Sequence, residues 1–144
     1  MVGEAPGREE DISGRPFVGR GGRLLSASLD AVGSSRKEVF ITNVVKCRPP
    51  RNRVPLKPER TTCQSAHLKR EIEEVAPKVV VLLGRTAAFS VLGVSTLREA
   101  RGKLVRRDAR VYLPTFHPAA ILRNPRLKTT FQRDLRTAVV ASKK

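Results

Sequence analysis

The sequence has few cysteines and no long apolar segment. Only Cys47 and Cys63 occur among its 144 residues. No run of about eighteen apolar residues is present, which excludes a membrane-spanning helix, so we expect no membrane partner. The first residues, Met-Val-Gly-Glu, also lack the basic segment and apolar stretch of a secretory signal. We therefore expect a cytoplasmic protein.

These absences also limit the chemistry that the chain can carry out. A disulfide between Cys47 and Cys63 is not expected in the cytosol. Two thiols cannot by themselves complete a tetrahedral metal site or an iron–sulfur cluster. The hydrolase motifs GxSxG and HExxH are absent, and no cysteine stands beside His117. A hydrolase with this sequence would therefore have to use water as its nucleophile.

Acidic residues are scarce relative to basic ones. The chain has 29 Lys and Arg against 13 Asp and Glu, a net charge of +16 that is spread along its whole length. This balance favours a polyanionic partner. A basic solvated surface or a ribosome-associated protein would have the same composition, so charge alone does not decide between them.

Alternating apolar patterns predict one α/β domain over residues 1–144, since the chain is long enough for one core and too short for two. β-branched and apolar runs predict strands, whereas the spacing i, i+4, i+7 predicts helices. The strands are expected at 39–42, 79–83 and 111–113, and Pro114 ends the last of them. Three helices are expected, and their apolar positions are Leu25, Leu29 and Val32 in the first, Leu68, Ile72 and Val75 in the second, and Leu127, Phe131, Leu135 and Val139 in the third. This order favours helices packed on a mostly parallel sheet.

Two segments fall outside this pattern. Lys46–Pro58 holds four of the ten prolines and is typical of an extended basic loop. Met1-Val2 has the character of the last two residues of a strand, which would be too short to keep its place in a sheet. A misplaced gene start, a fragment of a longer chain or the loss of most of one strand would each explain it.

Polar residues follow several of the expected strands. Gly3–Gly7 follows the first, Asn43 the second, and His117 the late one. In an open parallel sheet, ligands bind beyond the carboxyl ends of the strands, so these groups should share one rim. Each has a common structural explanation as well, because a glycine-bounded turn, an Asn after a strand and a His before a proline occur in many proteins.

Four blocks of the sequence resemble a known family. They are GEAPGREEDISGRPFVGRGGRLL (3–25), ITNVVKCRPPRNRVP (41–55), PKVVVLLG (77–84) and PTFHPAAILRNP (114–125). In order and spacing they are similar to the family-4, iron–sulfur uracil-DNA glycosylases. The resemblance implies a three-layer α/β/α fold with a central, mostly parallel sheet. It also implies a monomeric base-excision repair enzyme that hydrolyses the N-glycosidic bond of uracil in DNA and leaves an abasic site.

The resemblance assigns roles in a pocket for an extruded nucleotide. Phe17 would stack on the uracil, and Asn43 would bond its edge by accepting from N3 and donating to O4. His117 would donate a hydrogen bond to O2 as negative charge develops there. The turn contributes Gly3 and Gly7, which line the pocket, and Glu4 and Ala5, which position the attacking water.

Gly7 stands where another branch of the superfamily has a tyrosine that blocks the thymine methyl. Ala5 stands where other branches have an aspartate. The resemblance therefore implies no such barrier and no strong general base. Stabilisation of the leaving uracil anion would then matter more than activation of water.

The resemblance also assigns contacts to DNA. A loop at 120–123 would enter the minor groove with Leu122 as a wedge. Arginines at five positions would hold phosphates: Arg20, Arg23, Arg51, Arg53 and Arg123.

Family members bind a [4Fe-4S] cluster through four cysteines, and Cys47 and Cys63 match the second pair. In the family the first pair lies upstream of the position of Met1. We therefore expect a chain truncated at its N-terminus relative to the family, with only half of the ligand set.

Two alternatives remain open at this stage. A related branch captures uracil DNA covalently through a histidine in a loop after the second strand, but Lys46–Pro58 contains no histidine. The chain could also be a folded, inactive DNA-binding remnant. An active enzyme would work in the cytoplasm, at the nucleoid in a prokaryote.

Overall fold

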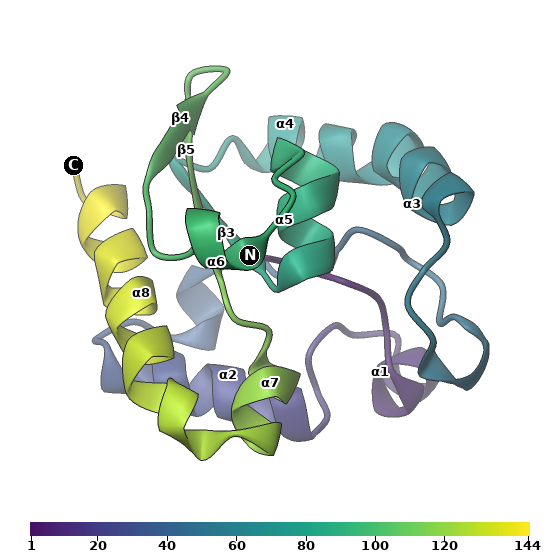
Figure 1. Ribbon diagram of the computed structural model, residues 1–144, viewed down its shortest axis with the longest axis horizontal. Helices are drawn as coiled ribbons and strands as arrows, with labels where there is room; N and C mark the ends of the chain where they lie inside the picture. The colour runs from purple at the N-terminus through teal and green to yellow at the C-terminus, as the bar shows by residue number, and fades with distance from the viewer.

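The computed structural model describes all residues from Met1 to Lys144 and contains one five-stranded sheet (Figure 1). The strand order is β2-β1-β3-β5-β4. The strands are β1 (Val2–Gly3), β2 (Thr42–Asn43), β3 (Val79–Leu83), β4 (Val105–Arg107) and β5 (Arg110–Thr115). All neighbours pair in parallel except β4, which is antiparallel to β5. The predicted mostly parallel sheet is thus confirmed.

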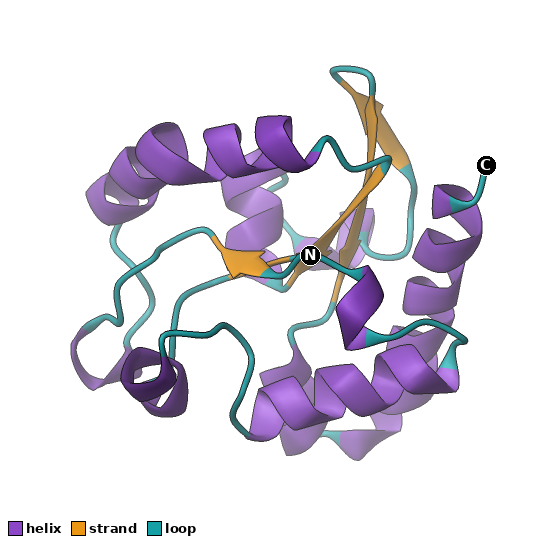
Figure 2. Ribbon diagram, turned by 180° about the vertical axis from the view of Figure 1, so that it is seen from behind, coloured by secondary structure: helices purple, strands orange, loops and turns teal.

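Helices cover both faces of this sheet (Figure 2). The α-helices are α1 (Arg8–Ser13), α2 (Arg20–Ala31), α3 (Lys57–Cys63), α4 (Lys69–Val75), α5 (Arg85–Leu92), α6 (Leu97–Ala100), α7 (Pro118–Arg123) and α8 (Lys128–Ser142). A π-helical turn, Gln64–Leu68, joins α3 to α4. Short 3-10 turns are η1 (Arg36–Glu38), η2 (Pro50–Asn52) and η4 (Pro125–Leu127).

The alternation of side chains along β3 creates two cores. Val81 and Leu83 pack with apolar residues of α2, α7 and α8 on one face. Val80 and Leu82 pack on the other face with α5 and with Leu68 and Ile72 of the π-turn and α4. Because successive side chains of a strand point to opposite faces, a continuous apolar run buries both sides, as the sequence predicted for residues 79–83. The result is the expected three-layer α/β/α arrangement.

Two of the predicted strands need correction. Residues 39–41 precede β2 rather than form part of it. Pro114 does not end the late strand but pairs with Leu82 inside β5. Its carbonyl accepts from the Gly102 N–H at 2.8 Å. The backbone nitrogen and the carbonyl of one strand residue point to the same side of the strand. The Pro114 nitrogen therefore faces the β4 side at a point beyond the end of β4, where no strand would accept a hydrogen bond from it.

The expected basic loop 46–58 is largely irregular, but it contains the η2 turn and ends where α3 begins at Lys57. The antiparallel strand β4 was not predicted. It joins β5 through Asp108 and Ala109, with φ of 49° and 60°. Positive φ at both central residues is the geometry of a tight hairpin turn that matches the strand twist.

The two ends of the sheet differ in character. The β4–β5 hairpin projects from one end, whereas α1 and α7 lie at the opposite end, where the parallel strands reach their carboxyl termini (Figure 1). None of the helices is long and apolar enough to cross a membrane.

Candidate active site

A cavity of about 400 Å³ lies at the carboxyl ends of the parallel strands. It is bordered by the loop after β1, the segment before α2, β2 and the start of α7. The predicted site residues that line it are Glu4, Ala5, Gly7, Phe17, Asn43, His117, Leu122, Arg53 and Arg20. The structure thus brings together most of the groups that the sequence placed on one rim.

Phe17 occupies a strained backbone position beneath this cavity. Its side chain is buried and its φ is 51°, a value that aromatic residues rarely adopt. Glu10 Oε1 accepts from the N–H groups of Val18 and Gly19 at 3.2 and 3.1 Å. Arg36 donates to the Phe17 carbonyl at 2.6 Å and also to the Pro16 carbonyl. These bonds hold the unusual conformation from both sides.

Asn43 presents a buried amide with a free acceptor. The residue is 5% exposed, and its Oδ1 has no hydrogen-bond partner. A Cβ placed on Gly3 would lie 2.5 Å from this oxygen and 2.6 Å from the Phe17 ring. Only glycine fits there, because the amide and the aromatic ring both close on its Cα. An unpaired buried acceptor is costly unless a ligand satisfies it.

His117 lies against Phe17 in the site, with ring centroids 5.5 Å apart. Its Nδ1 accepts from the Ala119 N–H at 3.0 Å, so the neutral ring carries its proton on Nε2. Burial, reinforced by the Arg123 charge and partly opposed by Glu10, lowers the pKa of His117 to about 4. The imidazole is therefore neutral at pH 7 and can still donate from Nε2.

The turn after β1 holds Glu4 beside the cavity. Its carboxylate accepts from the Thr86 hydroxyl at the start of α5, and its carbonyl accepts from the Val45 N–H at 3.0 Å. Ala5 lines the cavity without a polar side chain. Glu4 is thus the carboxylate that this turn brings to the cavity.

The sequence suggested a loop at 120–123, but this segment forms the body of α7. Pro118 begins this helix and His117 caps it through the Ala119 contact, which explains the helical path. Ile121 is buried in the core, whereas Leu122 is 36% exposed at the cavity rim. Arg123 is exposed at the helix end but does not line the cavity.

The arginines expected at phosphates differ in availability. Arg53 binds Glu59 through two nitrogens, at 2.9 and 2.7 Å, and this pairing is the main cause that lowers the pKa of Glu59 to about 2. Arg23 lies 3.8 Å from Glu9. Arg20 and Arg51 are exposed. The Glu59 carboxylate would therefore compete with a phosphate for Arg53.

The two cysteines lie outside the cavity. Cys47 is exposed after β2, and Cys63 is half-buried at the end of α3, next to the π-helical turn. No group of three or more His, Cys, Asp or Glu side chains in the chain could hold a metal ion. The residues present do not complete a cluster site.

Sequence reasoning missed several residues that shape the site. Glu10 and Arg36 fix the Phe17 segment, Thr86 binds Glu4, and Asn52 lines the cavity with φ of 55°. Asn52 Oδ1 accepts from Arg48 at 2.7 Å. No local pattern marks these contacts, although Glu10 and Asn52 lie within the blocks that carry the family resemblance.

Comparison with known proteins gives consistent matches. The profile of the uracil DNA glycosylase superfamily matches residues 1–139. The type-4 uracil-DNA glycosylase of Sulfurisphaera tokodaii is 45% identical, with 94% of this chain and 66% of that protein covered. The Archaeoglobus fulgidus protein of the same description is 40% identical, with coverages of 94% and 72%. The one from Thermotoga maritima is 47% identical, with coverages of 86% and 66%. The chain spans roughly two thirds of the length of these relatives.

Proposed function

The chain belongs to the type-4 family of the uracil-DNA glycosylase superfamily, and from this we propose that it hydrolyses the N-glycosidic bond of uracil in DNA. The products would be free uracil and an abasic site, the first intermediate of base-excision repair. The observation that carries the proposal is the unpaired, buried Asn43 Oδ1 in a cavity that Phe17 and His117 also line. A base edge with a matching donor would satisfy it.

The cavity suits a nucleotide that has been swung out of the DNA stack. The Phe17 ring provides a stacking surface whose position is fixed by Glu10 and Arg36. The Asn43 amide would accept from uracil N3 and donate to O4. Cytosine has an acceptor at N3 and a donor at its exocyclic nitrogen, so it would leave both groups of the amide unsatisfied. Recognition of the base is therefore assigned to Asn43.

Bond cleavage is assigned to stabilisation of the leaving group. As the bond between C1′ and N1 breaks, its electron pair passes to the uracil ring and negative charge grows on O2. The neutral His117 can donate from Nε2 to that oxygen. A donor aimed at developing charge lowers the barrier more than it strengthens ground-state binding. Water then adds to C1′, and its released proton balances the charge of the uracil anion.

Glu4 and Ala5 would position that water. Glu4 is the carboxylate of this turn, and its bond to Thr86 fixes its direction. Ala5 adds no base, so the water would arrive after the glycosidic bond is largely broken. Gly3 and Gly7 would keep the pocket open, and Gly7 places no side chain against a 5-methyl group.

The exposed arginines around the cavity would hold the DNA backbone. Arg20 lines the cavity, and Arg123 and Arg51 lie exposed on α7 and η2. Leu122, at the cavity rim, would act as the wedge that fills the space left by the extruded nucleotide. The net charge of +16 supports binding to phosphates. We propose that the protein acts as a monomer on chromosomal DNA. In a prokaryote this DNA forms the nucleoid, in the cytoplasm.

Cys47 and Cys63 are proposed as two ligands of a [4Fe-4S] cluster. Such a cluster needs four thiolates, so the other two would come from outside these 144 residues. The cluster would bind the segment after β2 to the end of α3. Base recognition and cleavage of the glycosidic bond do not involve the cluster.

A uracil-release assay tests the proposed function. DNA carrying one uracil and a labelled end is incubated with the protein and then cleaved at abasic sites. Catalytic turnover, with more product than protein, would support the glycosylase. A stable protein–DNA adduct would instead indicate a capturing protein, and binding without product would indicate an inactive remnant; either outcome would overturn the proposal.

A further inference from the structure

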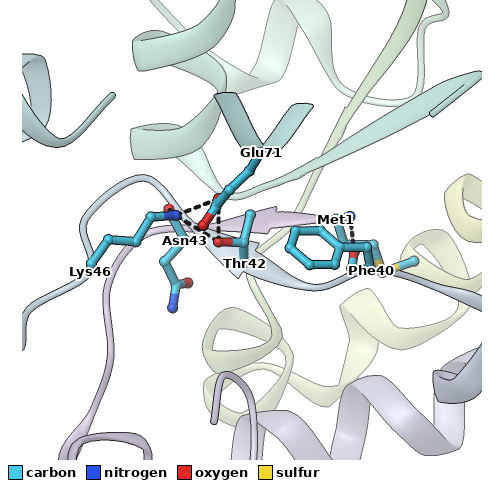
Figure 3. A network of polar contacts seen from close by, with 6 residues as sticks. All are labelled: Met1, Phe40, Thr42, Asn43, Lys46 and Glu71. Atoms are coloured by element: carbon cyan, nitrogen blue, oxygen red, sulfur yellow. Dashed lines mark hydrogen bonds and ion pairs between the residues drawn. The ribbon is translucent and has the colours of Figure 1, made fainter. Parts of the chain in front are cut away.

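A polar network lies at the sheet edge behind Asn43 (Figure 3). Lys46 Nζ donates to Thr42 Oγ1 at 2.6 Å, to the Asn43 carbonyl at 2.7 Å and to Glu71 Oε2 at 2.6 Å. The Thr42 hydroxyl donates to the same Glu71 oxygen at 2.8 Å. An ammonium has three donors, so Lys46 has none left for a phosphate.

The network compensates for the weakness of β2. This strand has two residues and lies at the edge of the sheet. On the side of β1, the Thr42 N–H donates to the Met1 carbonyl and the Val44 N–H donates to the Gly3 carbonyl. Because peptide groups alternate in direction along a strand, those of Asn43 face the open edge. Lys46 therefore satisfies a carbonyl that no neighbouring strand covers.

The side chain of Asn43 points away from the Lys46 ammonium, toward the cavity (Figure 3). Its Oδ1 is in close contact with Gly3, where an added Cβ would lie only 2.5 Å away. A small shift of β2 would thus move the amide out of register with a base stacked on Phe17. A displacement of about 1 Å at a reacting or recognising group can lower rates about 100-fold.

We propose that Lys46, held by Glu71 of α4, is a positioning residue that fixes the Asn43 amide for base recognition. This inference rests on the proposed function, since it takes Asn43 as the reader of uracil. If Lys46 formed only a structural ion pair, its loss would lower the stability of the fold alone. If Lys46 contacted a phosphate, its loss would weaken binding to all DNA sequences equally.

The test compares Lys46→Met with Lys69→Met, which removes an equal charge from an exposed position on α4. Affinity is measured for DNA carrying one non-cleavable 2′-fluoro-deoxyuridine and for the same DNA with deoxycytidine there. The ratio of the two dissociation constants is the uracil preference. Lys46→Met should lower this preference about tenfold or more, the effect of losing a charge-assisted hydrogen bond. Its affinity for the cytidine DNA should match that of Lys69→Met.

Thr42→Val separates positioning from stability. It removes one hydroxyl of the network but leaves the bond between Lys46 and the Asn43 carbonyl. If Lys46 acts by positioning, Thr42→Val should keep most of the uracil preference even where its melting temperature falls. A preference that simply follows melting temperature across both variants would overturn the inference. If Lys46→Met does not fold, Lys46→Gln, whose shorter side chain still donates, replaces it and should show a smaller loss.

The controls distinguish this inference from the proposed function. Wild-type protein without any uracil preference would overturn the proposed function, and the positioning role with it. A wild-type preference that a folded Lys46→Met retains in full would overturn the positioning role alone.

Discussion

The imidazole of His117 and the ring of Phe17 lie 5.5 Å apart between centroids, with their planes tilted by 34°. One residue follows β5 and the other precedes α2, so the contact joins segments 100 positions apart in the chain. Between them they offer a stacking surface and a neutral hydrogen-bond donor. Replacing each residue separately tests this division of labour.

Replacing His117 with alanine should lower single-turnover cleavage of uracil DNA by roughly 100-fold to 1000-fold, the usual effect of deleting one donor to a developing anion. Binding should barely change, because the bond strengthens mainly in the transition state. Single-turnover rates and the affinity for non-cleavable DNA measure the two effects. Near-full cleavage by a folded variant would refute the role of His117.

Replacing Phe17 with alanine should weaken binding of the extruded base by about 1–3 kcal/mol, the value of one base stacked on an aromatic ring. Affinity for DNA without uracil should stay near that of the wild type, since the buried Phe17 side chain has no charge or hydrogen-bond donor for a phosphate. The measurement is again the ratio of dissociation constants. An equal loss for both DNAs would point to general unfolding instead.

The pKa of His117 predicts how stability depends on pH. The folded pKa of about 4 lies below the ordinary value of 6.5. Between these values the unfolded chain binds more protons, so the His117 contribution is complete above pH 6.5 and is lost as pH falls towards 4. The contribution is at most roughly 3 kcal/mol. In urea unfolding, the stability of the wild type should fall relative to that of His117→Asn as pH drops from 6.5 towards 4, and parallel curves across this range would contradict the shift.

Chain order explains why much of the fold and the rim of the site could be predicted. The apolar run 79–83 and the last helix are local patterns, and they lie in the structure as β3 and α8. The carboxyl ends of parallel strands share one edge, which is sufficient to bring Asn43 and His117 together.

Other features depend on contacts that local patterns do not show. Glu10 and Arg36 reach the Phe17 segment across 8 to 20 residues of sequence. Positive φ at Phe17, Asp108 and Ala109 is imposed by tertiary contacts and a tight turn rather than by local preference. The family resemblance assigned Arg53 to a phosphate, but only the structure shows its two bonds to Glu59.

Iron analysis tests the proposed cluster ligands. The 144 residues provide only Cys47 and Cys63, so the purified chain alone should contain far less than one cluster's worth of iron. A longer form with two further cysteine ligands should absorb broadly near roughly 400 nm, and Cys47→Ser in that form should reduce this absorbance. A full iron complement on the 144-residue chain would refute a four-cysteine site.

Salt dependence tests how DNA is held. With on the order of five or more phosphate contacts, the slope of log affinity against log salt should be about −4 or steeper. Arg51→Ala combined with Arg53→Ala should flatten the slope without changing which base is removed, because phosphate contacts carry no base information. Glu59, which binds Arg53 at 2.9 and 2.7 Å, competes with phosphates for this arginine, so Glu59→Gln should strengthen binding to DNA of any sequence. Titrations at several salt concentrations give both results. If Glu59→Gln left affinity unchanged while Arg51→Ala alone accounted for the flattened slope, Arg53 would be a structural partner of α3 and not a phosphate contact.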